Sequence, residues 1–265
     1  ATNTGITLSG TNVVVAAGTP AGDYSLVYQI CENLNPTNCD QATVTVTVTK
    51  AVIDAIDDVV AGPINGKDGG DAGINVLDND TLNGVKVVPA DVVITSTATT
   101  ALSVNTDGSV SVAAGTPAGD YTIQYTICEK LNPSNCDTAT VTVTVGKAII
   151  DAIDDVVAGP INGKDGGDAG INVLDNDTLN GVKVVPADVV ITSTATTALS
   201  VNTDGSVSVA AGTPAGDYTI QYTICEKLNP SNCDTATVTV HVVAAPIDAV
   251  SDIGGPINGT TGGTV

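Results

Sequence analysis

A repeat of 97 residues constrains this chain more than any other feature. Cys31, Cys128 and Cys225 are each 97 residues apart, and residues 53–143 recur without a change as residues 150–240. A fixed period of this kind is typical of tandem domains, in which every copy folds as the same unit. Copies kept identical show no divergence toward separate active sites. The expected domains are the C-terminal part of a repeat (1–50), two complete repeats (51–147 and 148–244) and the N-terminal start of a further repeat (245–265).

The pattern within one repeat is all-β. Val, Ile and Thr alternate along several short runs, which indicates strands with one buried and one exposed face. Asp107-Gly108 and Asn83-Gly84 are pairs that form tight turns. About seven strands in a unit of this length are typical of an Ig-like β-sandwich. We therefore predict tandem Ig-like β-sandwich domains stacked end to end as a rod, with a pitch of roughly 35 to 45 Å. The expected strands are Gly73–Leu77, Val85–Val88, Asp91–Ser96, Ala101–Asn105, Ser109–Ala113, Gly119–Cys128 and Thr138–Val145.

Two tyrosines of each repeat lie in the longest predicted strand. The sequence Gly119-Asp120-Tyr121 resembles the tyrosine corner of Ig-like folds, in which a Tyr hydroxyl binds the backbone upstream. Alternation places Tyr121 and Tyr125 on the apolar face of the strand. We therefore expect both rings in the core, and not as a platform for stacking sugars.

Each repeat carries one Cys-x7-Cys pair, with the turn-forming Asn132-Pro133 in the middle of the second pair. Two thiols without a histidine make a poor zinc shell, so a disulfide across a hairpin is the better interpretation. A closed loop this short stabilises the fold by roughly 2 to 3 kcal/mol at most. Disulfides indicate an oxidising, extracellular compartment. The predicted bridges are Cys31–Cys39, Cys128–Cys136 and Cys225–Cys233.

The charge balance disfavours several classes of partner. The chain has 29 acidic residues against 8 basic ones, for a net charge of -21. Such a chain repels phosphate backbones and anionic lipid surfaces, so we expect no nucleic-acid partner. No apolar run is long enough to span a bilayer, so we expect no membrane insertion in this segment.

Clustered carboxylates suggest a cation. Asp57-Asp58 and Asp78-Asn79-Asp80 offer the hard oxygen ligands that calcium prefers. Their spacing matches neither an EF-hand nor an RTX nonapeptide, and the same residues could instead cap turns and keep a long chain soluble. A glycosidase carboxylate pair would need a cleft and sugar-binding aromatics, for which the sequence gives no sign. The candidate ligands are Asp57, Asp58, Asp78, Asp80, Asp154, Asp155, Asp175 and Asp177.

Longer strings carry a resemblance to a known family. IDAIDDVVAGPINGKDGGDAGINVLDNDTLNGV and AGTPAGDYTIQYTICEKLNPSNCDTATVTVTV resemble the repeats of SprB-like gliding-motility adhesins, the giant repeat adhesins of Bacteroidota. The first string is also similar to the opening of cadherin-like and VCBS-type repeats. This resemblance implies calcium near the junctions, export by type IX secretion and a filament attached to the outer membrane. It also implies O-glycosylation at Asp-Thr-hydrophobic tripeptides, for which the candidates are Thr138 and Thr235 first, then Thr81 and Thr178.

These observations lead to a functional expectation. We expect a non-enzymatic, extracellular stalk of a large adhesin, which serves surface attachment in gliding motility. Its partners would be neighbouring repeats, an external surface or polysaccharide bound by a distant tip, and the gliding and secretion machinery. The alternatives are a spacer or binding module of an extracellular carbohydrate-active enzyme, and a surface-layer protein. His241 replaces the Thr144 of the preceding copy on the exposed face, so it cannot be a catalytic base common to the repeats.

Overall fold

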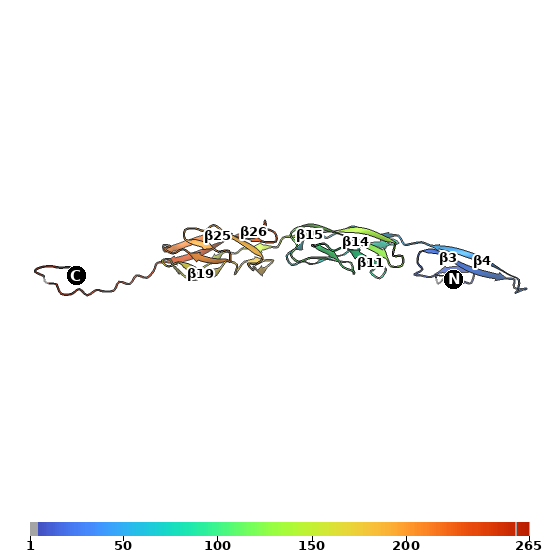
Figure 1. Ribbon diagram of the computed structural model, residues 1–265, viewed down its shortest axis with the longest axis horizontal. Helices are drawn as coiled ribbons and strands as arrows, with labels where there is room; N and C mark the ends of the chain where they lie inside the picture. The colour runs from blue at the N-terminus through green and yellow to red at the C-terminus, as the bar shows by residue number, and fades with distance from the viewer. Residues whose placement is uncertain (1–4, 258, 265) are drawn as a thin grey trace. The chain divides into compact units, whose positions relative to one another are not determined.

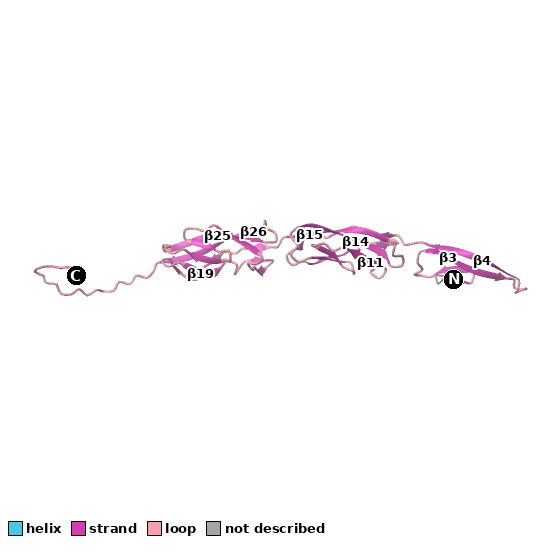
Figure 2. Cartoon of the chain, viewed as in Figure 1, coloured by secondary structure: helices cyan, strands magenta, loops and turns pink. Residues whose placement is uncertain are grey.

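The computed structural model describes residues 5–257 and 259–264, and its regular structure consists of strands (Figure 2). The chain divides into two compact units, Ala1–Ala148 and Ile149–Val265. The described part of the chain contains no helix that could cross a membrane. The predicted all-β fold class is confirmed.

A long hairpin forms part of the sandwich in the first unit (Figure 1). Its strands are β14 (Gly119–Glu129) and β15 (Cys136–Gly146), which pair in antiparallel register from Gly119↔Val145 to Cys128↔Cys136. β11 (Val92–Ser96) pairs with the free edge of β14. β6 (Asp58–Val59) and β7 (Ile64–Asn65) pair with β15 in parallel. This sheet therefore joins two early strands of the repeat, β6 and β7, to its last strand.

Two smaller sheets complete the sandwich. One has the order β12-β13-β8, and the other has the order β10-β9-β5. Alternate residues of the long hairpin face the shared core, where Ile127, Val141 and Val143 are fully buried with Val76 and Val110. The strands of these sheets are β5 (Ile53–Asp54), β8 (Gly70–Asn75), β9 (Thr81–Leu82), β10 (Val85–Lys86), β12 (Leu102–Val104) and β13 (Ser109–Val112).

The seven predicted strands are present, with shifted ends. The largest error concerns Gly73–Leu77, because the observed strand begins at Gly70 and ends at Asn75. Its pairing with β13 changes register between Ser109 and Ser111, and this irregularity breaks the alternation from which strands are predicted. The turn at Asn83-Gly84 is confirmed, with φ of 53° and 73° at the two residues.

The two tyrosines behave differently. Tyr125 is 1% exposed, as predicted for a core residue. Tyr121 is half-buried against the core, and its hydroxyl donates to the Pro117 carbonyl at 3.0 Å. That bond is the expected tyrosine corner.

The N-terminal segment of the first unit consists of two hairpins. β1 (Ile6–Ser9) pairs with β2 (Asn12–Val15), and β3 (Gly22–Cys31) pairs with β4 (Cys39–Val48). The second hairpin ends in a disulfide, as do the long hairpins of both units. All three predicted bridges form, each with a Cα–Cα distance of 4.1 Å.

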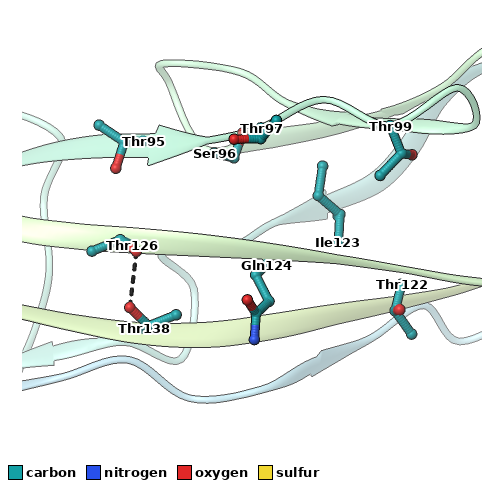
Figure 3. Close-up of a pocket in the computed structure, with 9 residues that line it drawn as sticks. All are labelled: Thr95, Ser96, Thr97, Thr99, Thr122, Ile123, Gln124, Thr126 and Thr138. Carbon is teal, nitrogen blue, oxygen red and sulfur yellow. Dashed lines mark hydrogen bonds between the residues drawn. The ribbon is translucent and has the colours of Figure 1, made fainter.

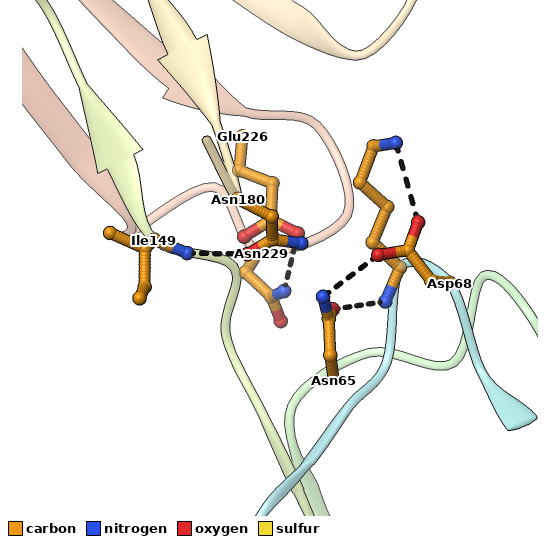
Figure 4. A network of polar contacts seen from close by, with 7 residues as sticks. Asn65, Asp68, Ile149, Asn180, Glu226 and Asn229 are labelled. Atoms are coloured by element: carbon orange, nitrogen blue, oxygen red, sulfur yellow. Dashed lines mark hydrogen bonds and ion pairs between the residues drawn. The ribbon is translucent and has the colours of Figure 1, made fainter. Parts of the chain in front are cut away.

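The second unit repeats the same sandwich. At its start the Ile149 amide donates to Asn180 Oδ1 at 2.9 Å (Figure 4), as the Val52 amide does to Asn83 Oδ1 in the first unit. His241 lies on the exposed face of the last strand, with Nδ1 2.6 Å from Asp217 Oδ1. The strands are β16 (Ile150–Asp151), β17 (Asp155–Val156), β18 (Ile161–Asn162), β19 (Gly167–Asn172), β20 (Thr178–Leu179), β21 (Val182–Lys183), β22 (Val189–Ser193), β23 (Leu199–Val201), β24 (Ser206–Val209), β25 (Gly216–Glu226) and β26 (Cys233–Val243).

Candidate functional site

A buried pair of carboxylates is the most unusual chemical feature of each repeat. In the first unit Asp80 is fully buried and Asp58 is 9% exposed. The Tyr125 hydroxyl lies 3.0 Å from Asp80 Oδ1 and 3.1 Å from Asp80 Oδ2. The same hydroxyl is 3.2 Å from the carbonyl oxygens of both Ile56 and Val76. Four acceptor oxygens therefore surround one tyrosine hydroxyl.

The cluster has more acceptors than donors. A tyrosine hydroxyl carries one hydrogen, so it satisfies only one of the four oxygens around it. The Ile56 amide supplies a second hydrogen, to Asp80 Oδ1 at 2.8 Å. Asp58 Oδ2 and Asn79 Oδ1 are shielded from solvent and have no hydrogen-bond partner. An additional proton on one carboxyl would supply a donor that this arrangement lacks.

The raised pKa values of the two carboxyls agree with a proton retained in the cluster. Burial, with a smaller contribution from the nearby charge of Asp80, raises the pKa of Asp58 to about 6. Burial also raises the pKa of Asp80, although the Ile56 amide and Tyr125 favour its charged form. Burial raises the pKa of Tyr125 itself, so the phenol stays protonated. One proton shared in this cluster is therefore favourable in mildly acidic solution.

The second unit contains the same cluster. Asp177 is fully buried, Asp155 is 9% exposed and Asp155 Oδ2 has no partner. The Tyr222 hydroxyl lies 3.0 Å from Asp177 Oδ1. Burial raises the pKa of Asp155 to about 6. The arrangement thus belongs to the repeat and not to one position in the chain.

The structure separates the predicted calcium ligands. Asp58 and Asp80 come together, but Asp57 Oδ1 accepts the Thr140 amide at 2.8 Å. Asp78 is exposed and forms an ion pair with Lys86 at 2.8 Å. Among the described residues no three His, Cys, Asp or Glu side chains are grouped closely enough to hold a metal. The copies follow the same division, with Asp154 bound to the Thr237 amide and Asp175 paired with Lys183.

Calcium does not fit the buried pair as it stands. Calcium takes six to eight oxygen ligands, whereas the Tyr125 hydroxyl already occupies the point where Asp80 and the two carbonyls converge. The two oxygens without partners, on Asp58 and Asn79, are shielded from solvent, and together with Asp80 they provide fewer oxygens than calcium requires. The donor set suits a proton better than a calcium ion.

A hydroxyl-lined hollow lies on the outer face of the large sheet. Its lining residues come from β11, the segment that follows β11 and the long hairpin (Figure 3). The hollow has a volume of about 440 Å³. Thr138 is exposed at its edge, and its hydroxyl lies 2.8 Å from that of Thr126. A similar hollow of about 450 Å³ in the second unit includes Thr235. Of the four glycosylation candidates these two are exposed, whereas Thr81 and Thr178 are half-buried in short strands.

Sequence reasoning missed the part played by Tyr125. The position of this residue between Ile123 and Ile127 on an apolar face predicts a buried ring, and a buried phenol hydroxyl needs a polar partner. The chain offered many acidic residues as that partner. The pairing with Asp80, 45 residues earlier, depends on how the two sheets pack.

Comparisons with known proteins identify no family for the chain. No family model and no curated protein match it. Similar solved structures include an endo-fucoidan hydrolase from glycoside hydrolase family 107, with a TM-score of 0.34 and 14% identity over 91% of this chain and 37% of that chain. Extracellular cadherin domains 3–6 of protocadherin gamma B2 give a TM-score of 0.31 and 10% identity, over 91% of this chain and 66% of that chain. Domains EC22–24 of mouse cadherin-23 give a TM-score of 0.32 and 12% identity, over 84% of this chain and 74% of that chain. At these TM-scores the likenesses assign no activity.

Proposed function

We propose that this chain is part of the stalk of a large, non-enzymatic cell-surface adhesin, in which each sandwich transmits tension along the chain. The three disulfides indicate an extracellular location. The repeats are identical over most of their length, which suits a stalk that is lengthened by adding copies.

The parallel pairing of two early strands, β6 and β7, with the last strand of the repeat is the observation that carries this proposal. β6 and β7 lie parallel to β15, with Asp58 opposite Val141 and Ile64 opposite Val145. The chain enters beside the start of β15, where the Ala55 amide donates to Asp137 at 2.8 Å. It leaves at the other end of β15, after Gly146. Entry and exit therefore lie at opposite ends of one strand.

This arrangement determines how a pulled repeat resists force. Tension on the two ends slides β6 and β7 along β15, so the hydrogen bonds between these strands are loaded together and must break together. A hairpin opened from one end would instead lose its bonds one at a time. The second unit has the same pairing, between β17, β18 and β26. Both complete repeats are thus built to carry load between their ends.

The finer parts of the proposal rest on the resemblance of the sequence. Gliding motility, type IX export, outer-membrane attachment and a tip that binds a surface or polysaccharide belong to the adhesins that this chain resembles. The end-to-end stacking of repeats into a rod stays a prediction. Calcium has no role in the stalk proposal, because the cluster at Asp58 and Asp80 does not fit it.

A spacer or binding module of an extracellular carbohydrate-active enzyme is the second candidate. Its support is the hydroxyl-lined hollow, an uncharged surface on an acidic chain. The two proposals differ in where the repeats are found and how many there are. A spacer needs few copies, whereas a stalk needs many.

Immunogold labelling of intact cells of the native host, with antibodies raised against the 265-residue chain, tests the proposal. We expect label spaced along threads that extend from the cell surface. Label confined to a soluble secreted protein with glycosidase activity would overturn the stalk in favour of the spacer. Label in ordered lateral sheets would favour a surface layer.

A further inference from the structure

We propose that the disulfide-closed loop Cys128–Cys136 is the surface by which a repeat binds the segment that precedes it, with Asn132 as the central contact. Asn132 is 8% exposed, and its Oδ1 accepts the backbone amide of Ala21 at 2.7 Å. Ala21 lies between β2 and β3 in the N-terminal segment of the same unit. The inference requires only that repeats follow one another, so it stands or falls separately from the adhesin proposal.

The loop fixes which way the Asn132 amide faces. Its Nδ2 donates to Glu129 Oε1 at 2.8 Å, and Asn135 Nδ2 donates to Glu129 Oε2 at 2.9 Å. Glu129 is 5% exposed. A charged carboxylate only accepts hydrogen bonds, so the Nδ2 side of Asn132 must face it. The opposite atom, Oδ1, is then directed at the partner as an acceptor that needs an N–H group.

The preceding segment presents such a group in a fixed direction. The Tyr24 hydroxyl donates to the Pro20 carbonyl at 2.8 Å. The Pro20 carbonyl and the Ala21 N–H belong to one peptide unit, and in a trans peptide they point in opposite directions. By holding the carbonyl on one side, Tyr24 turns the Ala21 N–H toward Asn132. The tyrosine corner therefore orients the peptide that the loop binds.

Two further contacts widen the surface. Asn135 Nδ2 also donates to the Ala51 carbonyl at 2.9 Å. Lys50 Nζ donates to Ser134 Oγ at 2.9 Å. The loop thus binds both the turn before β3 and the connection that follows β4. Contacts at two separated points restrict rotation, which one hydrogen bond would not.

The binding surface is preformed. In loop Cys31–Cys39 the Glu32 amide donates to the Asn38 carbonyl at 3.0 Å, and Asn38 Nδ2 donates to Glu32 Oε2 at 3.1 Å, although Asn35 is exposed. In the second unit Asn229 Nδ2 donates to Glu226 Oε1 at 2.9 Å (Figure 4). Hydrogen bonds between the glutamate and asparagine side chains of the loop therefore form in all three copies. In loop Cys31–Cys39 they form although the central Asn35 is exposed.

Both partners recur in the sequence. Residues 16–22, AAGTPAG, are repeated as residues 113–119 and 210–216, and the loop recurs with the period of the repeat. The hydroxyls of Tyr121 and Tyr218 also donate to the carbonyls of Pro117 and Pro214. Every copy thus carries the oriented peptide as well as the loop. We infer that the function of the disulfide is to shape this docking surface, beyond its effect on the stability of the hairpin.

Amide hydrogen exchange of Ala21, measured by NMR in the intact 265-residue chain, tests the inference. Asn132→Ala should speed the exchange of Ala21 by about five-fold to ten-fold, because it removes one net hydrogen bond. The matched control is Asn35→Ala, which changes the equivalent side chain in loop Cys31–Cys39 and should leave Ala21 unaffected. An Ala21 amide that exchanges at the unprotected rate in the unaltered chain, or equally in both variants, would overturn the proposal.

Reduction of the disulfides gives a second measurement that does not depend on the folding of a variant. Opening the loop should release Ala21 while the amides of β14 and β15, such as Tyr125, stay protected by their ladder. Protection of Ala21 that survives both reduction and Asn132→Ala would contradict the proposal.

Discussion

Replacing the buried Asp58 and its copy Asp155 by asparagine should stabilise both repeats at neutral pH. The folded-state pKa of Asp58 is about 6, against an ordinary value of 3.8. A raised pKa means that the folded state binds the proton more tightly than the unfolded state does. Stability from this group is therefore fully present below about pH 4 and is lost as the pH rises through 6.

The size of this effect follows from the shift. At 1.36 kcal/mol for each pKa unit, the charged Asp58 costs a repeat about 3 kcal/mol of unfolding free energy above pH 6. This is an upper value, because Asp58 and Asp80 interact and share the proton. Asparagine keeps the shape of the side chain, carries no charge and adds an N–H donor to a cluster that has too few.

The assay is urea unfolding of the unaltered chain and of the Asp58→Asn/Asp155→Asn variant, in calcium-free buffer between pH 4 and pH 8. We expect the two to be similar at pH 4 and the variant to be more stable by up to about 3 kcal/mol per repeat at pH 8. Asp78→Asn/Asp175→Asn is the control, since it removes a carboxylate from an exposed ion pair and should change stability by less than about 1 kcal/mol. A variant that is less stable than the unaltered chain at pH 8 would refute the reasoning.

Three other predictions follow from the geometry. Gly66→Ala should destabilise the first sandwich by about 1 to 3 kcal/mol in urea unfolding, because an added Cβ would overlap the Thr116 carbonyl oxygen. Gly62→Ala is the control, since its added Cβ meets nothing within 4 Å and should be neutral. Addition or chelation of calcium should leave the melting temperature of the chain unchanged. If calcium raises the melting temperature of the unaltered chain but not that of Asp58→Asn/Asp155→Asn, the cluster binds calcium and this prediction is wrong. In protein isolated from its native host, mass spectrometry should show hexose-type masses on peptides containing Thr138 and Thr235, which are exposed. Unmodified peptides at all four candidate threonines would refute the glycosylation prediction.

Some parts of this structure could be predicted from the sequence because they depend on local patterns. The alternation of Thr with Val141, Val143 and Val145 predicts β15, and the Cys-x7-Cys spacing predicts its disulfide. The strands β5, β6, β7 and β9 have two residues each, too few to show a period. They form because tertiary packing places them beside longer strands.

The cluster of Asp58, Asp80 and Tyr125 was predictable only in part. The sequence marked both carboxylates as candidate ligands, together with Asp57 and Asp78. All four carboxylates lie in similar acidic stretches of the sequence. Only the fold buries Asp58 and Asp80 together, while Asp57 binds a backbone amide and Asp78 binds an exposed lysine. Electrostatic preference alone would keep two carboxylates apart.

Single-molecule force spectroscopy of the chain, pulled by its two ends with the disulfides intact, tests the load-bearing proposal most directly. Unfolding one 97-residue repeat with its loop closed releases about 90 residues, or about 310 Å of extended chain, less the roughly 35 Å length of a folded strand. We therefore predict two separate rupture events of similar force, each lengthening the chain by about 275 Å. A chain that extends smoothly, without such events, would contradict a stalk built from force-resisting repeats.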